Sequence, residues 1–351
     1  MIGVIAATGF TGRLIAAELK ALNADFFVAG RNEAALKKLS TALSGVAWRH
    51  LDVLQSQTFN CLSDCRVIIN CAGPFIDFGE PIVQEALTRN CHYLDLTGEQ
   101  AFIKLIFEKY DEQAKQNQLA LIPGCAFEYA LGDAAGAQIC EELSDCRVID
   151  VLYHVQNMHT SAGTRRSIIR ALSSPGFEFS QGKLNKVAPG SRMSRAQIEG
   201  KTYTIVSFPS GEALMLPKHC ALDEIQTFMS VDAPPFLVSA LAKIAPPILS
   251  TFSDVLVKAI KSDAYPSEEQ RRSTNFVLRV GGRAKEKRRE LMLKGNDPYG
   301  LTAQIAAHVA VSLAQQGPLS CGAISPSMVA GFQFIKNIVC KDGVTWSDQS
   351  P

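Results

Sequence analysis

The first 125 residues alternate short apolar runs with stretches of helical periodicity. Helical spacing predicts helices at 12–22, 32–43, 79–90 and 99–117. In the second of these, Leu36, Leu39 and Leu43 share one face, and Asn32 is a suitable N-cap. Runs rich in Val, Ile and Phe stand at 2–5, 26–29, 46–51, 66–71, 92–96 and 119–122. This alternation is typical of βαβ units and predicts an α/β domain, a parallel doubly wound sheet covered on both faces.

The pattern changes after Pro123-Gly124. Period-two alternation over 197–231 and 273–294 predicts strands, and Gly281-Gly282 predicts a hairpin turn. These segments indicate a second, α+β domain with a mostly antiparallel or mixed sheet. Further elements are expected as helices at 130–143, 161–173, 299–316 and 325–338 and as a long strand at 146–158.

Three other segments lack a clear period or are unusually apolar. Residues 180–195 are polar and basic, and they predict a mobile loop. Residues 298–335 contain no Asp, Glu, Lys or Arg and are interpreted as buried helices. Residues 233–260 are apolar but interrupted by Lys243, Asp254 and Lys258, so no transmembrane span is expected. Peripheral contact of 233–260 with lipid or with a partner subunit stays open.

Composition narrows the classes of function. The chain has 351 residues, with 35 Lys plus Arg against 34 Asp plus Glu, a formal charge of +1. Such a balance argues against a nucleic-acid partner. Ten scattered cysteines without a CxxC pair favour buried thiols in a reducing compartment over disulfides, and no metal site is expected. The chain shows no leader pattern, so a cytoplasmic location is predicted.

The turn after the first apolar run has the pattern of a phosphate-binding loop. The sequence Ala6-Ala7-Thr8-Gly9-Phe10-Thr11-Gly12 links a predicted strand directly to a predicted helix. In a GxxGxxG-type loop, glycines allow close approach of the pyrophosphate and of helix to strand, and the helix N-terminus attracts phosphate. Ala6 replaces the first glycine, which is expected to crowd the tight turn and weaken affinity.

Two further strand ends should lie at the same edge. The second strand ends at Gly30 and Arg31, where NAD-specific sites usually carry a carboxylate, and this favours the 2′-phosphate of NADP. The alternative is an exposed surface arginine. The fourth strand is followed by Cys71, Ala72, Gly73, Pro74 and Phe75. The small residues of this segment could admit the nicotinamide ribose, and Pro74 and Phe75 could form a wall beside the nicotinamide ring. After the fifth strand, Asp95 and Glu99 could be catalytic, or Thr97 or Glu99 could cap a helix.

With these residues in view, the chain resembles saccharopine dehydrogenase-like oxidoreductases, a family that includes trans-acting enoyl reductases. The matching stretches are ATGFTG (7–12), AGR (29–31), NCAGPF (70–75), GEP (79–81), HYLDLTGE (92–99), PGCAFE (123–128), SAGTRRS (161–167), YPSEEQR (265–271), DPYGLTA (297–303) and ISPS (324–327). The resemblance implies NADP(H) and a variant Rossmann domain, predicted at 1–125. It also implies an α+β substrate and dimerisation domain, predicted at 126–296, and C-terminal helices at 297–351 returning to the first domain.

Hydride transfer also needs a proton donor and groups that hold the substrate. No tyrosine is followed four residues later by lysine, which excludes the common Tyr-x-x-x-Lys acid. Glu128, Tyr129 and His154 are candidate catalytic residues. Linker packing explains Glu128 and Tyr129 at least as well, and a satisfied core or surface histidine is the default interpretation of His154. Candidate substrate contacts lie where a helix opens and could bind an anion, at Ser161, Gly163, Thr164 and Arg165. A basic solvated face is the alternative.

Three functions remain open. The first is an NADPH-dependent reductase of an activated C=C bond, such as an enoyl thioester or another apolar or lipid-linked substrate. The second is saccharopine-type hydride transfer at a C–N bond. The third is a dinucleotide-binding scaffold or sensor without turnover.

Overall fold

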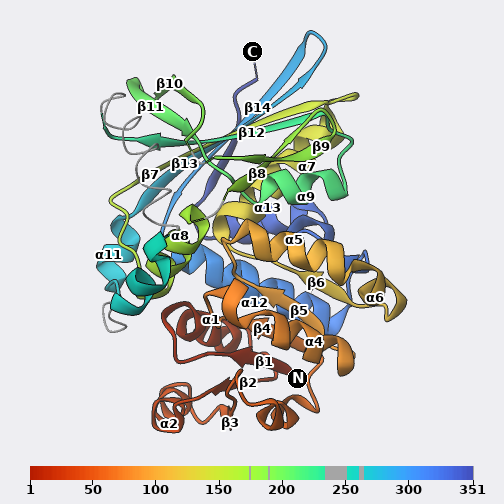
Figure 1. Cartoon of the computed structure of the whole chain (residues 1–351), viewed down its shortest axis with the longest axis vertical. Coiled ribbons are helices and arrows are strands. Elements are labelled where there is room, and N and C mark those ends of the chain that lie inside the picture. The colour runs from red at the N-terminus through yellow and green to blue at the C-terminus, as the bar shows by residue number, and fades with distance from the viewer. Residues whose placement is uncertain (174, 189, 234–250, 261–264, 351) are drawn as a thin grey trace. The chain divides into compact units, whose positions relative to one another are not determined.

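The computed structural model describes residues 1–173, 175–188, 190–233, 251–260 and 265–350. They form two compact units (Figure 1). The first comprises Met1–Ala130 and Tyr299–Val339, and the second comprises Leu131–Pro298 and Cys340–Pro351. The last twelve residues thus group with the second unit, whereas the helical segment before them groups with the first.

The first unit is built on sheet A, whose seven described strands are all parallel. The doubly wound α/β prediction is therefore confirmed, and the order of the first six strands is that of a Rossmann sheet. The strands run in the spatial order β15 (Gly322–Ala323), β6 (Ala120–Ile122), β5 (His92–Asp95), β4 (Val67–Asn70), β1 (Ile2–Ile5), β2 (Phe26–Gly30) and β3 (Ala47–His50).

Helices bury the faces of sheet A, as continuous apolar strands require. Every residue of β1, β2, β4 and β5 is buried. In α2 the predicted cap is confirmed, because Asn32 Oδ1 accepts a hydrogen bond from Ala35 N–H (3.0 Å). The helices are α1 (Phe10–Ala21), α2 (Glu33–Ala42), η1 (Ser56–Leu62), α3 (Phe75–Phe78), α4 (Glu80–Thr88), α5 (Gln100–Lys109), α6 (Asp111–Gln116) and η3 (Pro326–Met328). Three more helices run across the unit boundary: α7 (Phe127–Glu142), α12 (Pro298–Gln315) and α13 (Phe332–Lys341).

The second unit is built on sheet B, which is mixed, as predicted. The strands β7 and β12 pair in parallel, and the other pairs are antiparallel. The main path is β10 (Met193–Ile198), β11 (Lys201–Ser207), β12 (Glu224–Val231), β7 (Val148–Gln156), β13 (Asn275–Ala284), β14 (Lys287–Asn296) and β16 (Thr345–Asp348), with β8 (Gly176–Ser180) and β9 (Lys183–Val187) joined to β12. Its helices are α8 (Ala162–Leu172), α9 (Glu212–Met215), η2 (Leu216–Lys218) and α11 (Glu268–Ser273).

The predicted hairpin turn at Gly281-Gly282 is wrong. Both glycines lie inside β13, and the turn falls at Lys285 and Glu286, after the last pair of the ladder, Ala284 with Lys287. Gly282 has a packing role instead, because a Cβ there would lie 2.2 Å from Ile139 Cγ2 on α7. The glycine lets the helix approach the sheet.

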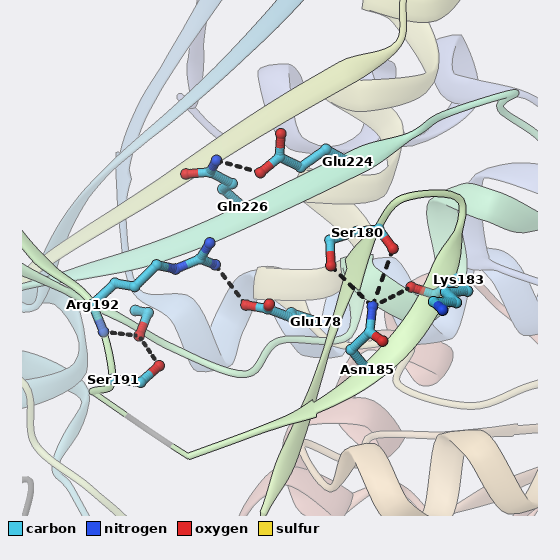
Figure 2. A network of polar contacts seen from close by, with 9 residues as sticks. Glu178, Ser180, Lys183, Asn185, Ser191, Arg192, Glu224 and Gln226 are labelled. Carbon is cyan, nitrogen blue, oxygen red and sulfur yellow. Dashed lines mark hydrogen bonds and ion pairs between the residues drawn. The ribbon is translucent and has the colours of Figure 1, made fainter.

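The loop predicted at 180–195 is wrong for 180–187, where β8 and β9 form a hairpin, and for 193–195, where β10 begins. Its polar residues bond to one another, as Figure 2 shows. Asn185 Nδ2 donates to Ser180 O (3.1 Å), and Arg192 Nη2 donates to Glu178 Oε2 (2.7 Å). Polarity here reflects a sheet edge whose side chains pair with each other, and not an absence of secondary structure.

The apolar segments follow the prediction where the structure describes them. The helix α12 buries most of its length. Within the described residues no helix is both long and apolar enough to cross a membrane. Of the apolar segment 233–260, residues 234–250 lie outside the described residues, and residues 251–259 are helical.

Candidate functional site

The phosphate loop joins β1 to α1 with the expected close approach. Gly9 is the N-cap of α1, and its N–H donates to Ala6 O (3.0 Å). A Cβ on Gly12 would lie 2.8 Å from Ala7 Cα and 2.9 Å from Ala6 O, both backbone atoms. Glycine is therefore required at position 12, and the N-terminus of α1 presents its dipole beside this loop.

Ala6 occupies a backbone conformation that favours glycine. Its φ is 54°, in the left-handed region. The Cβ atom of alanine costs roughly 1–2 kcal/mol in that region, because it approaches the following carbonyl oxygen. The first position of the loop thus needs glycine-like geometry, and this chain adopts it with an alanine.

The end of β2 lies against the phosphate loop. A Cβ on Gly30 would lie 3.8 Å from Ala6 Cα and 4.0 Å from Thr8 Oγ1. Arg31 follows and is exposed, and the described residues place no ion-pair partner beside it. The position next to the loop therefore carries an unneutralised guanidinium and no carboxylate.

The end of β4 continues the same edge. Cys71 N–H donates to Ile5 O (3.1 Å), so the chain stays beside β1 after the strand ends. Asn70 is fully buried, accepts from Ala72 N–H at Oδ1 (2.9 Å) and donates from Nδ2 to Tyr93 Oη (3.1 Å). Burial raises the pKa of the Cys71 thiol to about 12, so it is no nucleophile at neutral pH.

Glu99 holds the segment after β4 from the neighbouring strand end. Its Oε1 accepts from Phe75 N–H (3.0 Å) and its Oε2 from Ile76 N–H (2.9 Å), and the side chain is 3% exposed. Glu99 is the N-cap residue of α5 but makes no side-chain cap bond there. Instead its carboxylate caps α3 and sets the position of Phe75.

Asp95 ties the end of β5 to the turn after β6. Its Oδ1 accepts from Thr97 N–H (2.9 Å) and Gly124 N–H (2.9 Å), and Cys125 N–H donates to Asp95 O (2.7 Å). Its Oδ2 is buried without a hydrogen-bond partner. Burial raises the pKa of Asp95 to about 7, against the opposing effect of the two backbone N–H donors.

Glu128 and Tyr129 lie in the first turn of α7, in the first unit. Tyr129 is 2% exposed, and its hydroxyl donates to Gly98 O (3.0 Å). Burial raises the pKa of Glu128, so this carboxyl keeps a proton to higher pH than a solvated one. Phe127 N–H donates to Thr302 Oγ1 (3.1 Å), which anchors the start of α7 on α12.

His154 lies on β7 in the second unit and is 5% exposed. Its Nδ1 is 2.7 Å from Ser230 Oγ, and its ring centroid is 4.5 Å from that of Tyr203. Burial lowers its pKa, which favours the neutral imidazole. These contacts are those of a histidine satisfied within a sheet.

The N-cap of α8 uses two of the groups predicted to bind an anion at the start of this helix. Ser161 Oγ accepts from Thr164 N–H (3.2 Å), and the two hydroxyl oxygens are 3.1 Å apart. Gly163 is exposed, and Arg165 is half-buried without an ion-pair partner among the described residues. Arg165 is therefore the cation of this group that stays available.

Several residues at the edge of sheet A escaped sequence reasoning. Tyr299 packs edge-on against Phe10 of the phosphate loop, with centroids 4.9 Å apart. Tyr299 and Thr302 come from a helix almost 300 residues away along the chain, so no local pattern could associate them with the loop. The DPYGLTA stretch was the only signal.

The second unit holds a buried polar cluster that sequence reasoning also missed. The carboxylate of Glu212 is fully buried and accepts hydrogen bonds from the hydroxyls of Tyr153 and Ser210. Burial raises the pKa of Glu212 to about 7. Nearby on α7, fully buried Asp133 pairs with His219 Nε2 (2.6 Å). Burial lowers the pKa of His219, but the Asp133 charge outweighs it and the net shift is upward.

Comparison with known proteins confirms the resemblance to saccharopine dehydrogenase-like proteins. A Caenorhabditis elegans protein named lipid droplet localized protein is 26% identical over 51% of this chain and 42% of its own length. An Arabidopsis thaliana mitochondrial saccharopine dehydrogenase-like oxidoreductase is 29% identical over 36% of this chain and 31% of its own. A Mycobacterium tuberculosis protein described as a trans-acting enoyl reductase is 28% identical over 41% of this chain and 38% of its own.

The matched regions span less than half the length of these curated relatives. No protein-family profile matches the chain. Among solved structures, a saccharopine dehydrogenase from Saccharomyces cerevisiae superposes with a TM-score of 0.68 at 12% identity, covering 100% of this chain and 99% of that one. This likeness establishes the two-domain fold.

Proposed function

We propose that this chain is an NADP(H)-dependent oxidoreductase that transfers hydride to an activated C=C bond of an enoyl-type or similar apolar substrate. One observation carries the cofactor assignment: an uncompensated Arg31 stands beside the phosphate loop where an NAD site would have a carboxylate. The relatives described as oxidoreductases and as a trans-acting enoyl reductase support the reaction class.

The residues at the edge of sheet A fit a dinucleotide. Gly9, the N-cap of α1, would let the pyrophosphate approach the helix N-terminus, and Gly12 lets α1 pack closely on the loop. The turn between them and β1 runs through Ala7, Thr8, Phe10 and Thr11. Gly30 and Arg31 would take the adenosine 2′-phosphate, and the segment 71–75 would border the nicotinamide ribose and ring. When bound, the cofactor supplies the hydride. The chain binds and orients it, with Glu99 holding Phe75 in place.

Glu128 is the favoured proton donor among the three candidates. Its raised pKa keeps a proton available to higher pH than a solvated carboxyl would, and it belongs to the same unit as the phosphate loop, whereas His154 belongs to the second unit. Arg165 is the favoured contact for a substrate carboxylate or thioester oxygen. The second unit would serve as substrate and dimerisation domain of a cytoplasmic homodimer, with a lipid-linked substrate as one option.

Two other functions have specific support. The engaged hydroxyl of Tyr129 and the strained Ala6 favour a dinucleotide-binding scaffold or sensor. The relatives named saccharopine dehydrogenase-like favour hydride transfer at a C–N bond. An NADPH oxidation screen with enoyl thioesters, ketones and imino acids separates the three, and tight NADPH binding without turnover supports the scaffold.

The cofactor proposal is tested by Arg31→Ala. A guanidinium bound to the 2′-phosphate gives charge-assisted hydrogen bonds, so NADPH affinity should fall about tenfold or more while NADH affinity stays nearly constant. The matched control is Lys38→Ala, another exposed cation close in sequence, which should change neither affinity. Fluorescence titration measures both. Equal losses for NADPH and NADH would refute the NADP assignment.

A further inference from the structure

The helix at residues 251–259 turns its apolar side to solvent. Phe252 is 53% exposed, Val255 65% and Leu256 36%, and Ala259 is also exposed. These positions follow the spacing i, i+3, i+4 and i+7, which places them on one face of a helix. We call this set the apolar stripe. A surface helix normally buries such a face against its own protein, so this helix has the reverse orientation.

The orientation is held by two arginines of the neighbouring helix α8, which lies beside it in Figure 1. Arg166 donates to Val257 O (3.3 Å) and Ile260 O (2.6 Å), which satisfies carbonyls at the C-terminal end of the helix. Arg170 donates to Asp254 Oδ1 (2.8 Å). The polar contacts of the helix therefore face α8, and the apolar stripe is left outside.

The surroundings of the apolar stripe are positively charged. The helix α8 carries Arg165, Arg166 and Arg170 and no carboxylate. The single acid of residues 251–260, Asp254, is paired with Arg170. Arg165, Arg166 and the exposed Lys258 have no carboxylate partner among the described residues. An exposed apolar face flanked by uncompensated cations is the pattern of a helix that lies in a membrane interface.

We propose that the apolar stripe docks the protein onto the surface of an anionic lipid layer. Phe252, Val255 and Leu256 would enter the boundary between headgroups and acyl chains, and Lys258 on the same helix would meet anionic headgroups. A second copy of the chain is a poorer occupant, because a symmetric contact would bring the same cations against each other. This proposal concerns a surface and does not depend on the cofactor or on turnover.

Insertion is tested directly with Phe252→Trp in the full-length protein. Its emission should shift to shorter wavelength when vesicles of phosphatidylcholine mixed with phosphatidylglycerol are added, because the indole leaves water. Leu319→Trp, which replaces a residue 77% exposed in the first unit, is the matched control and should not shift. Lack of a shift for Phe252→Trp, or an equal shift for both variants, would overturn the proposal.

Vesicle co-sedimentation then measures the apolar and the charged contributions to binding separately. The triple variant Phe252→Gln, Val255→Gln, Leu256→Gln should lower partition about tenfold or more, whereas Leu54→Gln with Leu319→Gln should not change it. Lys258→Gln should weaken binding to anionic vesicles about fivefold and leave weak binding to neutral vesicles unaltered.

All of these side chains are exposed or half-buried, so circular dichroism should confirm unchanged folding. Failure of the wild-type protein to bind either anionic or neutral vesicles would refute the proposal. Analytical ultracentrifugation gives a second refuting result: a wild-type protein that is dimeric and a triple variant that is monomeric. The apolar stripe would then be covered by a second copy.

Discussion

The two units bury carboxylates in opposite ways. At the edge of sheet A, Glu99 accepts hydrogen bonds from the backbone N–H groups of Phe75 and Ile76 at the start of α3. Asp95 accepts from the backbone N–H groups of Thr97 and Gly124, in the segments that follow β5 and β6. In the second unit, Glu212 accepts from the hydroxyl of Tyr153 on β7 and from that of Ser210, two residues before it.

The difference separates two purposes of a buried charge. A carboxylate bound to backbone N–H groups sets the shape of a loop, and the loops it shapes lie where a dinucleotide would bind. A carboxylate bound to side-chain hydroxyls stabilises the packing around it and does not set the shape of a loop. We therefore expect substitutions in the first group to change ligand binding and substitutions in the second to change stability alone.

Removal of Glu212 is expected to have the largest effect. Glu212→Ala removes the acceptor of two buried hydroxyls and opens a cavity, which should lower the free energy of unfolding by about 3–5 kcal/mol. Urea denaturation measures the change, and Glu286→Ala, at an exposed turn, should stay within about 0.5 kcal/mol of wild type. The folded fraction should bind NADPH normally. Weakened binding would contradict the division between the two groups.

Glu99→Ala should affect both properties. The loss of two charge-assisted bonds to Phe75 and Ile76 should cost about 2–3 kcal/mol of stability. NADPH affinity should fall as well, because the segment after β4 is no longer held. Thermal unfolding and fluorescence titration check the two effects. Intact NADPH affinity in a destabilised variant would show that this loop does not touch the cofactor.

The two buried acids should also impose a pH dependence. Burial raises the pKa of Glu212 from 4.5 and that of Asp95 from 3.8, each to about 7 in the folded protein. A raised pKa means that the contribution to stability is full at low pH and is lost as pH rises through the folded value. Between about pH 5 and 6.5, Glu212→Gln should remove a slope of up to about 1.4 kcal/mol per pH unit.

Urea midpoints measured across that range for wild type, Glu212→Gln and Asp95→Asn test this. Identical slopes in all three proteins would mean that neither acid is protonated in the folded state above its ordinary pKa.

Ala6→Gly should have the smallest effect, and it is stabilising. Glycine adopts the φ of 54° without a Cβ clash, at the cost of extra freedom in the unfolded chain. A gain of about 0.5–1 kcal/mol is expected from thermal unfolding, with NADPH affinity equal or better. Glu286→Gly, at an ordinary turn position, should give no such gain. A destabilised Ala6→Gly variant would show that the alanine methyl packs favourably in the turn.

The elements of the first unit could be predicted because each depends on local pattern. Asn32 caps α2, and six apolar runs became six strands of sheet A. The second unit was predicted less well. The sequence predicts a turn at Gly282 because the contact that requires the glycine, with Ile139 on α7, comes from a distant part of the chain. It predicts a loop at 180–195 because the paired strands there carry mostly polar side chains.

The sequence by itself determined the parallel sheet, the phosphate loop and the position of Arg31, because strand ends, glycines and charges act through neighbours a few residues apart. Only the tertiary structure decided the roles of Glu99, Asp95 and Glu212, since their partners come from other segments of the chain. It also decided which side of the helix at 251–259 faces solvent. An amphipathic pattern states that a helix has two faces, but contacts such as those of Arg166 and Arg170 decide which one is buried.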